Sequence, residues 1–196
     1  MPRSSYLARV NTPGLGHEVK GSAFVTLRKW IADEHGTAML ERLLSSIPSD
    51  AKRALSDPLP SQWYPERVHA DALRALFDGI ARGDLDAFER IIGQCTALGV
   101  HTFANLVLTM SSPSFVLKRT PTLYGLIRRG PSTLDVDLKE HTAHLHYRGL
   151  PFFDDPLYRH YFRALLRALL TPSMKREPGV TLEAHAADSL DVRVDW

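Results

Sequence analysis

Histidine and carboxylate side chains alternate near the carboxyl end of the sequence, where they could bind a transition metal. His144 and His146 are two positions apart, so on a β-strand they project from the same face. Imidazole and carboxylate ligands suit zinc or a related metal. No spacing matches HExxH or a Cys/His zinc pattern, so we predict a solvated sheet face and no metal site. The residues expected to share this face are His144, His146, His185, Asp135, Asp137 and Glu183.

The single cysteine, Cys95, is a candidate nucleophile. Its helical neighbours Ile91, Ile92 and Leu98 are apolar, which predicts a buried thiol with a raised pKa and little reactivity. His101 is close in sequence, but no third group orients a Cys-His pair. The sequence also holds no glycine-rich phosphate loop, no Ser-His-Asp string and no paired acid motif. We therefore predict that the chain has no catalytic residues and is not an enzyme.

Positive charge gathers in residues 112–131, which contain no acidic residue. Such asymmetry is typical of a partner-docking surface or a phosphate site, and the alternative is a set of solvated helix faces. The net charge of +2 is too small to favour nucleic acid as a partner. The candidate partner-binding residues are Lys118, Arg119, Arg128 and Arg129.

The first two thirds of the sequence must position these groups mainly through helices. From Lys20, apolar residues recur three and four positions apart, the spacing of an amphipathic helix. Gly36 and Gly99 are expected to separate neighbouring helices, Gly36 as a left-handed cap. Trp63-Tyr64-Pro65 is expected to be a loop that leads into the next helix. Helices are predicted at about 20–35, 37–47, 65–82, 85–98 and 101–110, with shorter ones near 113–118 and 121–128. A short segment is also predicted from Ser49-Asp50, ended by the loop of Pro58 and Pro60.

At Gly130 the apolar period changes from 3.6 to 2, which predicts strands. We expect an α+β fold, with a helical N-terminal half and a C-terminal four-stranded antiparallel sheet in ββαββ order. The 196 residues suit one domain over 19–196, with a helical part at 19–130, a sheet part at 131–196 and a flexible leader at 1–18. The strands are predicted at about 132–138, 141–148, 179–186 and 189–196, with a helix near 155–170.

The single cysteine excludes an intrachain disulfide and fits a reducing compartment. The sequence shows no signal peptide and no apolar run long enough to span a membrane. We therefore expect a cytoplasmic protein.

Several strings resemble a known group of domains. They are VKGSAFV at 19–25, His35-Gly36, Trp63-Tyr64-Pro65, SPSFVLKRTPTLY at 112–124, and the final hairpin-helix-hairpin. Together they resemble the haem-nitric-oxide/oxygen-binding (H-NOX) domains, the 4-vinyl-reductase-like domains and the subunits of transport (TRAPP) particles. The sequence is most similar to a family of uncharacterised myxobacterial paralogues. The resemblance implies a fold like that of the H-NOX and 4-vinyl-reductase-like domains, and a role in sensing.

The resemblance also allows the residues that hold haem to be compared. H-NOX domains use a histidine on a helix before the sheet, and the nearest position here is Tyr124. They hold the haem propionates with Tyr-x-Ser-x-Arg, where this sequence keeps Tyr147 but has Gly149 and Pro151. We therefore expect no haem or other cofactor, and a structural role for Tyr124.

The leading hypothesis is a non-catalytic sensory or regulatory module that binds an apolar small ligand between helices and sheet. One alternative is a protein-interaction or dimerisation module with a filled core. For Trp63 and Tyr64, the structural alternative to a wall of the ligand chamber is a loop whose two aromatic rings plug the helical core. A minor alternative is a haem-based gas sensor. Neither nucleic acid nor a membrane span is expected. The candidate ligand-binding residues are Phe24, Trp63, Tyr64, Leu106, Tyr124, Leu145 and Tyr147.

Overall fold

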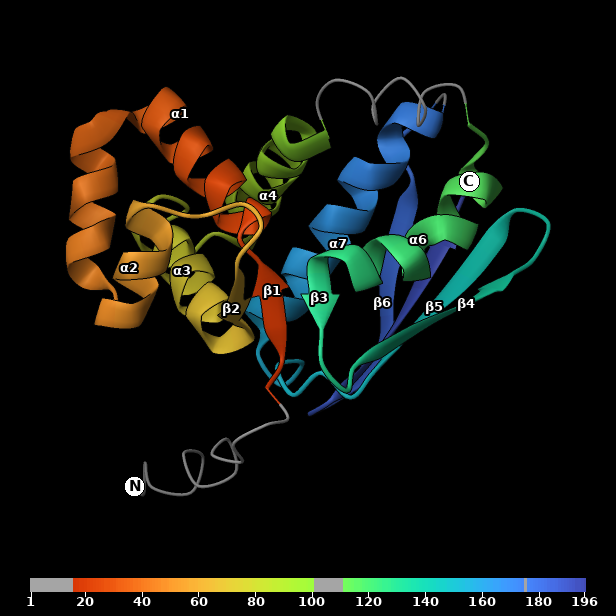
Figure 1. Cartoon of the computed structure of the whole chain (residues 1–196). Coiled ribbons are helices and arrows are strands. Elements are labelled where there is room, and N and C mark those ends of the chain that lie inside the picture. Colours follow the sequence, from red (N-terminus) through yellow and green to blue (C-terminus); the bar gives the residue numbers. More distant parts are fainter. Residues whose placement is uncertain (1–15, 101–110, 175) are drawn as a thin grey trace.

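The computed structural model describes residues 16–100, 111–174 and 176–196. In Figure 1, α1 to α3 lie at one end, the large sheet at the other, and α7 between them. No helix among the described residues has the length and apolarity needed to cross a membrane. The helices are α1 (Ser22–Ser46), α2 (Ser49–Ser56), α3 (Glu66–Gly79), α4 (Leu85–Val100), α6 (Pro113–Ile127) and α7 (Pro156–Leu170), followed by a short 3-10 helix (Thr171–Ser173).

The large sheet confirms the predicted fold class. Its strand order is β4-β5-β7-β6, and every neighbouring pair is antiparallel. Helix α6 packs on β4 and α7 packs on β6, so the apolar side chains of the sheet are covered. The strands are β4 (Thr133–Leu138), β5 (Thr142–Arg148), β6 (Gly179–Ala186) and β7 (Ser189–Asp195).

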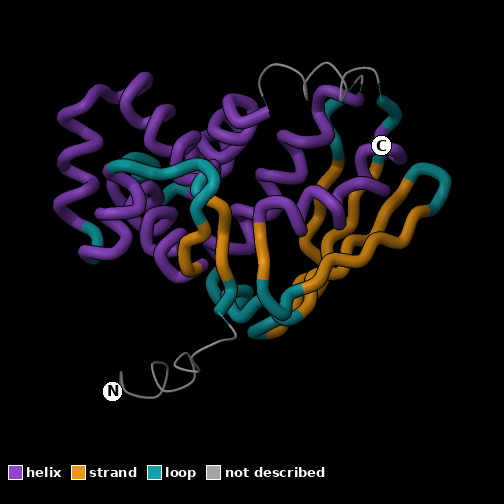
Figure 2. Tube along the Cα trace, viewed as in Figure 1, coloured by secondary structure: helices purple, strands orange, loops and turns teal. Residues whose placement is uncertain are grey.

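A second, smaller sheet joins three remote parts of the sequence, with strand order β2-β1-β3. Its strands are β1 (Glu18–Lys20), β2 (Trp63–Pro65) and β3 (Arg128–Arg129). Figure 2 shows these short strands between the helical half and the large sheet. Trp63-Tyr64-Pro65 is therefore a strand and not the predicted loop. Glu18, assigned by prediction to the leader, belongs to β1, while residues 1–15 lie outside the described residues.

Gly36 separates two helical stretches within Ser22–Ser46, as predicted, because its φ of 78° is not helical and forms a kink there. Two other predicted helix boundaries differ from the structure. Helix α4 runs through Gly99. Helix α6 runs through Pro121 as one helix, although an interior proline removes a backbone hydrogen bond. Buried residues on both sides of the proline, Leu117, Thr120 and Tyr124, anchor the helix in the core. The helix predicted at 101–110 lies outside the described residues, as does Leu106.

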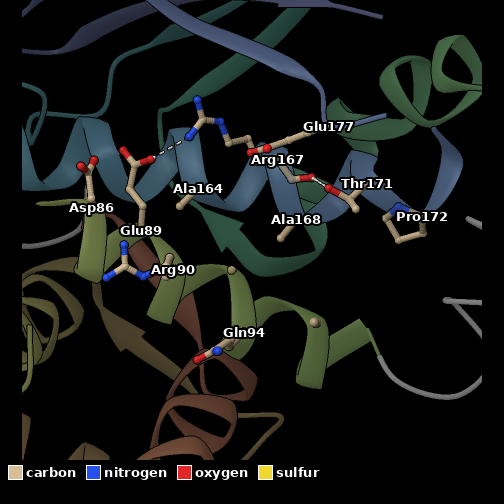
Figure 3. A pocket seen from close by; sticks show the side chains of 12 residues that line it. Asp86, Glu89, Arg90, Gln94, Ala164, Arg167, Ala168, Thr171, Pro172 and Glu177 are labelled. Carbon is tan, nitrogen blue, oxygen red and sulfur yellow. Dashed lines mark hydrogen bonds and ion pairs between the residues drawn. The ribbon is translucent and has the colours of Figure 1, made fainter. Parts of the chain in front are cut away.

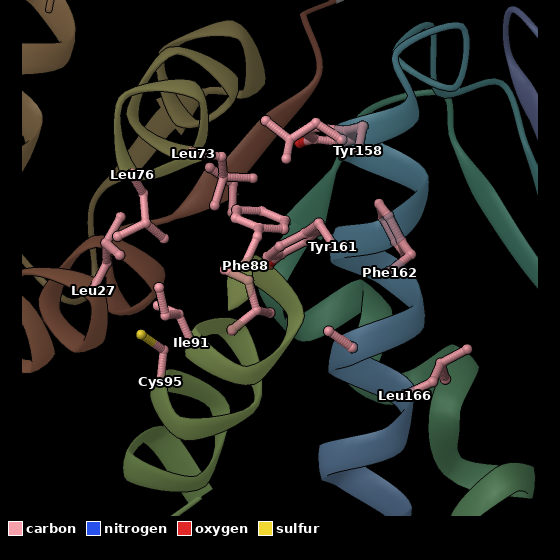
Figure 4. Packing of buried hydrophobic residues seen from close by; sticks show 14 of the residues in the cluster. Leu27, Leu73, Leu76, Phe88, Ile91, Cys95, Tyr158, Tyr161, Phe162 and Leu166 are labelled. Carbon is pink, nitrogen blue, oxygen red and sulfur yellow. The ribbon is translucent and has the colours of Figure 1, made fainter. Parts of the chain in front are cut away.

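The core is continuous across both halves. Figure 4 shows part of it, where Phe88 of α4 lies beside Tyr161 of α7. Among the helices that the structure describes, α4 and α7 make the most extensive contact. This contact helps to position the buried polar and aromatic residues between the helices and the large sheet.

Candidate functional site

The interior between the helices and the large sheet contains a buried ion pair. Arg128 Nε donates to Glu66 Oε1 over 3.2 Å, and the two residues are 3% and 1% exposed. The Tyr158 hydroxyl also donates to Glu66 Oε1. Arg128 donates a second bond to the Tyr161 hydroxyl over 3.4 Å. Glu66 begins α3 and Arg128 follows α6, so the pair joins two elements far apart in sequence.

Aromatic rings surround the Arg128 guanidinium. Its central carbon lies 4.8 Å from the ring centre of Phe162, 5.5 Å from that of Tyr161 and 5.7 Å from that of Tyr124. A guanidinium over aromatic faces is attracted by the ring quadrupoles. The cation is therefore held both by a carboxylate and by rings from α6 and α7.

The pKa values show which charges this cluster carries. Burial alone would raise the pKa of Glu66, but the charge of Arg128 and the neighbouring His69 and Tyr158 outweigh it and lower the pKa to about 2. Burial lowers the pKa of His69, whose Nδ1 lies 3.6 Å from Glu66 Oε1. At neutral pH, Glu66 is thus an anion and His69 is neutral.

The structure brings some of the predicted ligand-binding residues together, but their side chains pack against one another or against other rings. Ring centres are 5.0 Å apart for Phe24 and Tyr64, and 5.8 Å apart for Tyr124 and Tyr147. Leu145 is fully buried. Trp63 lies elsewhere, half-exposed, with the cations of Arg129 and Lys20 over its ring at 4.7 and 6.0 Å.

Further ring contacts connect the two ends of this interior. His69 lies 5.5 Å from Phe24 and 5.2 Å from Tyr161, measured between ring centres. Phe162 lies 5.5 Å from Tyr161 and 4.8 Å from Tyr147. A continuous series of rings therefore extends from α1 to β5.

A groove of about 670 Å³ lies between α4 and α7 (Figure 3). At its edge Glu89, 7% exposed, accepts hydrogen bonds from Arg163 Nε over 2.6 Å and from Arg167 Nη1 over 3.1 Å. His160 Nδ1 lies 2.5 Å from the same carboxylate. The groove is lined by Asp86, Glu89, Arg90, Gly93, Gln94, Ala97, Ala164, Arg167, Ala168, Thr171, Pro172 and Glu177.

A smaller pocket of about 410 Å³ lies between α1 and α3. It is lined in part by Met39, Arg42, Ile47 and Arg74. Among the described residues, none of the predicted ligand-binding side chains lines this pocket or the α4–α7 groove.

The predicted partner-binding residues divide into two groups. Lys118, Arg119 and Arg129 are exposed, whereas Arg128 is buried. The prediction that Arg128 contributes to a surface is therefore wrong, because its charge is paired with Glu66 in the interior. The exposed face of α6 also carries Phe115, over whose ring Arg119 lies at 5.5 Å.

The polar face of the large sheet carries histidine–carboxylate pairs. His144 Nδ1 lies 3.1 Å from Glu183 Oε2, and His146 Nδ1 lies 2.9 Å from Asp191 Oδ1. Within the described ranges, no group of three or more His, Cys, Asp or Glu residues is placed to hold a metal. His185 does not share this face, contrary to expectation. A β-bulge between Leu182 and Ala184 places it opposite Leu190, whose side chain is buried.

Cys95 is buried as predicted. Desolvation raises the pKa of its thiol to about 12. A thiol with such a pKa is a poor nucleophile at neutral pH, which supports the predicted inert role.

Sequence reasoning missed Glu66, His69 and Glu89. A periodicity in α3 could have revealed the first two, because Glu66, His69, Leu73 and Leu76 follow the 3-4-3 spacing of one helix face. All four are buried. For Glu89, the adjacent Phe88 marked the apolar face, but the cations that pair with it come from a distant helix.

The sequence matches no protein-family model and no curated protein. The fold, in contrast, is similar to solved structures of H-NOX proteins. An Fe(II) unliganded mutant from K. algicida has a TM-score of 0.65 and 12% identity, over 90% of this chain and 95% of that one. A mutant from S. oneidensis in an Fe(II) ligation state has a TM-score of 0.65 and 14% identity over the same shares. The chain therefore has an α+β fold of the H-NOX type.

Proposed function

We propose that this protein is a sensory or regulatory module that works without haem. The similarity in fold to H-NOX proteins supports the sensory role. Two of these solved structures concern the distortion of a bound haem. The proposal that the protein works without haem rests on the filled interior, where aromatic rings in contact with one another enclose the Arg128–Glu66 pair. A porphyrin between helices and sheet would have to displace these groups and leave buried charges unpaired.

The residues at the expected haem-holding positions do not fit that cofactor. The Tyr124 hydroxyl donates to Ser132 Oγ over 2.9 Å, and burial raises the pKa of Tyr124. The raised pKa opposes the tyrosinate form that can bind ferric haem. Gly149 and Pro151 offer no side-chain donor to a propionate.

Titration of the purified protein with hemin tests this proposal. We expect no stoichiometric Soret band, and the same spectra for wild type and Tyr124→Phe. A stoichiometric Soret band that is lost in Tyr124→Phe would overturn it and favour the haem-based gas sensor.

A second candidate function is a protein-interaction or dimerisation module that acts through the outer face of α6. Phe115 and Leu126 are 46% and 57% exposed there, with the exposed cations Lys118 and Arg119 between them in sequence. Apolar and basic side chains together suit an acidic partner with apolar anchors.

Sedimentation velocity over a concentration series tests self-association through this face. If α6 forms the interface, Leu126→Asp reduces the dimer and Leu59→Asp does not, because Leu59 is equally exposed on another part of the surface. A dimer that both variants preserve would exclude this interface.

We further propose that the protein works in the cytoplasm and catalyses no reaction. The buried, unreactive Cys95 supports a reducing compartment. The relation to the myxobacterial paralogues, to the 4-vinyl-reductase-like domains and to TRAPP subunits stays a prediction from the sequence strings. So does an apolar ligand between helices and sheet, which would require the packed rings to separate.

A further inference from the structure

We propose that the groove between α4 and α7 binds a small amphipathic monocarboxylate, with its head group at the arginines and its tail on the groove floor. This inference deepens the proposed sensory function, because it names a ligand class and a site outside the filled interior. The groove volume of about 670 Å³ is within the range of small-molecule sites.

The groove exists because the facing helices carry small side chains there. Gly93 and Ala97 of α4 face Ala164 and Ala168 of α7. Figure 3 shows the two alanines of α7 toward α4, with open space between the helices. Methyl groups and a bare backbone form an apolar floor, which suits a hydrocarbon tail, and Gln94 and Thr171 are the uncharged polar residues of the lining.

The head-group end is electrostatically suited to one negative charge. The buried carboxylate of Glu89 is shared by two permanent cations, Arg163 and Arg167. Taken alone, this cluster has one anion and two cations, so an added carboxylate would balance it. When Arg90, Asp86 and Glu177 are included, the groove has as many acids as cations.

Arg167 has guanidinium N–H donors that do not bind Glu89 and that could bind the carboxylate of a ligand. Glu89 binds only Nη1, and the Nε of Arg167 is buried with no hydrogen-bond partner among the described residues. The Nε and Nη2 atoms lie on one edge of the guanidinium, and such an edge can bind both oxygens of a carboxylate. Because Nε is buried, the Arg167 side chain has to turn toward the groove to bind a carboxylate in this way. Arg90, on the opposite helix, also lines the groove and forms no ion pair within the described ranges.

Two other acids limit the charge of the ligand. Asp86 and Glu177 also line the groove, and neither forms an ion pair with the described residues. They repel a second negative charge, so nucleotides and other polyanions are disfavoured. A ligand whose head group has a single negative charge and whose tail is nonpolar suits both the arginines and the apolar floor.

Isothermal titration with decanoate tests the site, with decanol and acetate as probes of tail and head alone. We expect saturable 1:1 binding of decanoate, and binding at least tenfold weaker for decanol and for acetate. Failure to bind decanoate, or equal binding of decanol, would overturn the proposal. Either result leaves the hemin titration unaffected, so the two proposals can fail separately.

Variants locate the binding. Arg90→Gln and Arg167→Gln should each weaken decanoate binding at least tenfold, and Ala168→Trp should abolish it by filling the groove. Arg42→Gln in the smaller pocket is the matched control and should bind as wild type does. Circular dichroism and thermal melts without ligand confirm that each variant is folded. Decanoate binding that is unchanged in the groove variants, or lost in Arg42→Gln, would contradict the assignment.

Discussion

Arg128 and Glu66 form a buried ion pair that links the end of α6 to the start of α3, with 3.2 Å between Nε and Oε1. A buried pair is not by itself strong evidence for stability, because both ions lose their hydration. Here the hydroxyls of Tyr158 and Tyr161 and the surrounding rings replace part of that hydration. The pair therefore fixes how the helical half meets the rest of the fold.

Removing one partner of this pair should be costly. We expect Arg128→Met to lower the free energy of unfolding by about 3–5 kcal/mol, because the Glu66 carboxylate is left buried and unpaired. The double variant Glu66→Gln/Arg128→Met should lose less than the sum of the single variants. Urea denaturation measures all three. Arg129→Met is the matched control, since its exposed pair with Glu18 should contribute about 1 kcal/mol or less.

Stability should fall as the pH becomes acidic. The folded state lowers the pKa of His69 below its ordinary value of 6.5, so the unfolded state takes up a proton first as the pH falls through that region. The pKa of Glu66 is 4.5 in the unfolded state and about 2 in the folded state, so a second part of the folding stability is lost as the pH falls between those values. Chemical denaturation from pH 7.5 to 3 measures the effect. His69→Gln should flatten the curve between pH 7 and 5; the same slope in both proteins would contradict the assignment to His69.

Leu145→Trp tests whether the interior is filled. Leu145 is fully buried on β5, opposite Val192 of β7, and a larger side chain should cost about 1–3 kcal/mol by overpacking. Thermal melts should show this loss, with no stabilisation of either protein by an apolar probe that lacks a carboxylate. A probe that stabilises wild type, with the effect lost in Leu145→Trp, would instead reveal a chamber at this position.

Cys95 should resist thiol reagents in the folded protein. Its pKa of about 12 leaves almost no thiolate at pH 8, and the side chain is buried. Ellman's reagent should react at least a hundredfold faster in 6 M guanidinium chloride than in native buffer. Rapid reaction of the native thiol would mean that α4 opens readily.

The hairpins and α7 could be predicted because their determinants are local. The alternation of Ala143, Leu145 and Tyr147 matches β5, and Asp155-Pro156 begins α7 as expected, with the Asp155 carboxylate accepting from the Leu157 backbone N–H. Each of these features involves residues adjacent in sequence or one helical turn apart.

The small sheet and the interior cluster could not be predicted from local patterns. Strands of two or three residues, such as β3 and β1, leave no measurable alternation. Arg128 and Arg129 are neighbours of one type, yet one is buried and the other exposed. Adjacent strand residues point to opposite faces, and the one that enters the core pairs there with Glu66, which the fold brings near.

The small sheet also bears on the order of folding. Val19 pairs with Tyr64 on one side and with Arg128 on the other, so two long stretches of chain must be closed into loops before these hydrogen bonds form. Loop closure carries an entropic cost that local contacts do not have. The hairpins and helices can therefore form early. The three short strands of the small sheet pair later, after those local elements have formed.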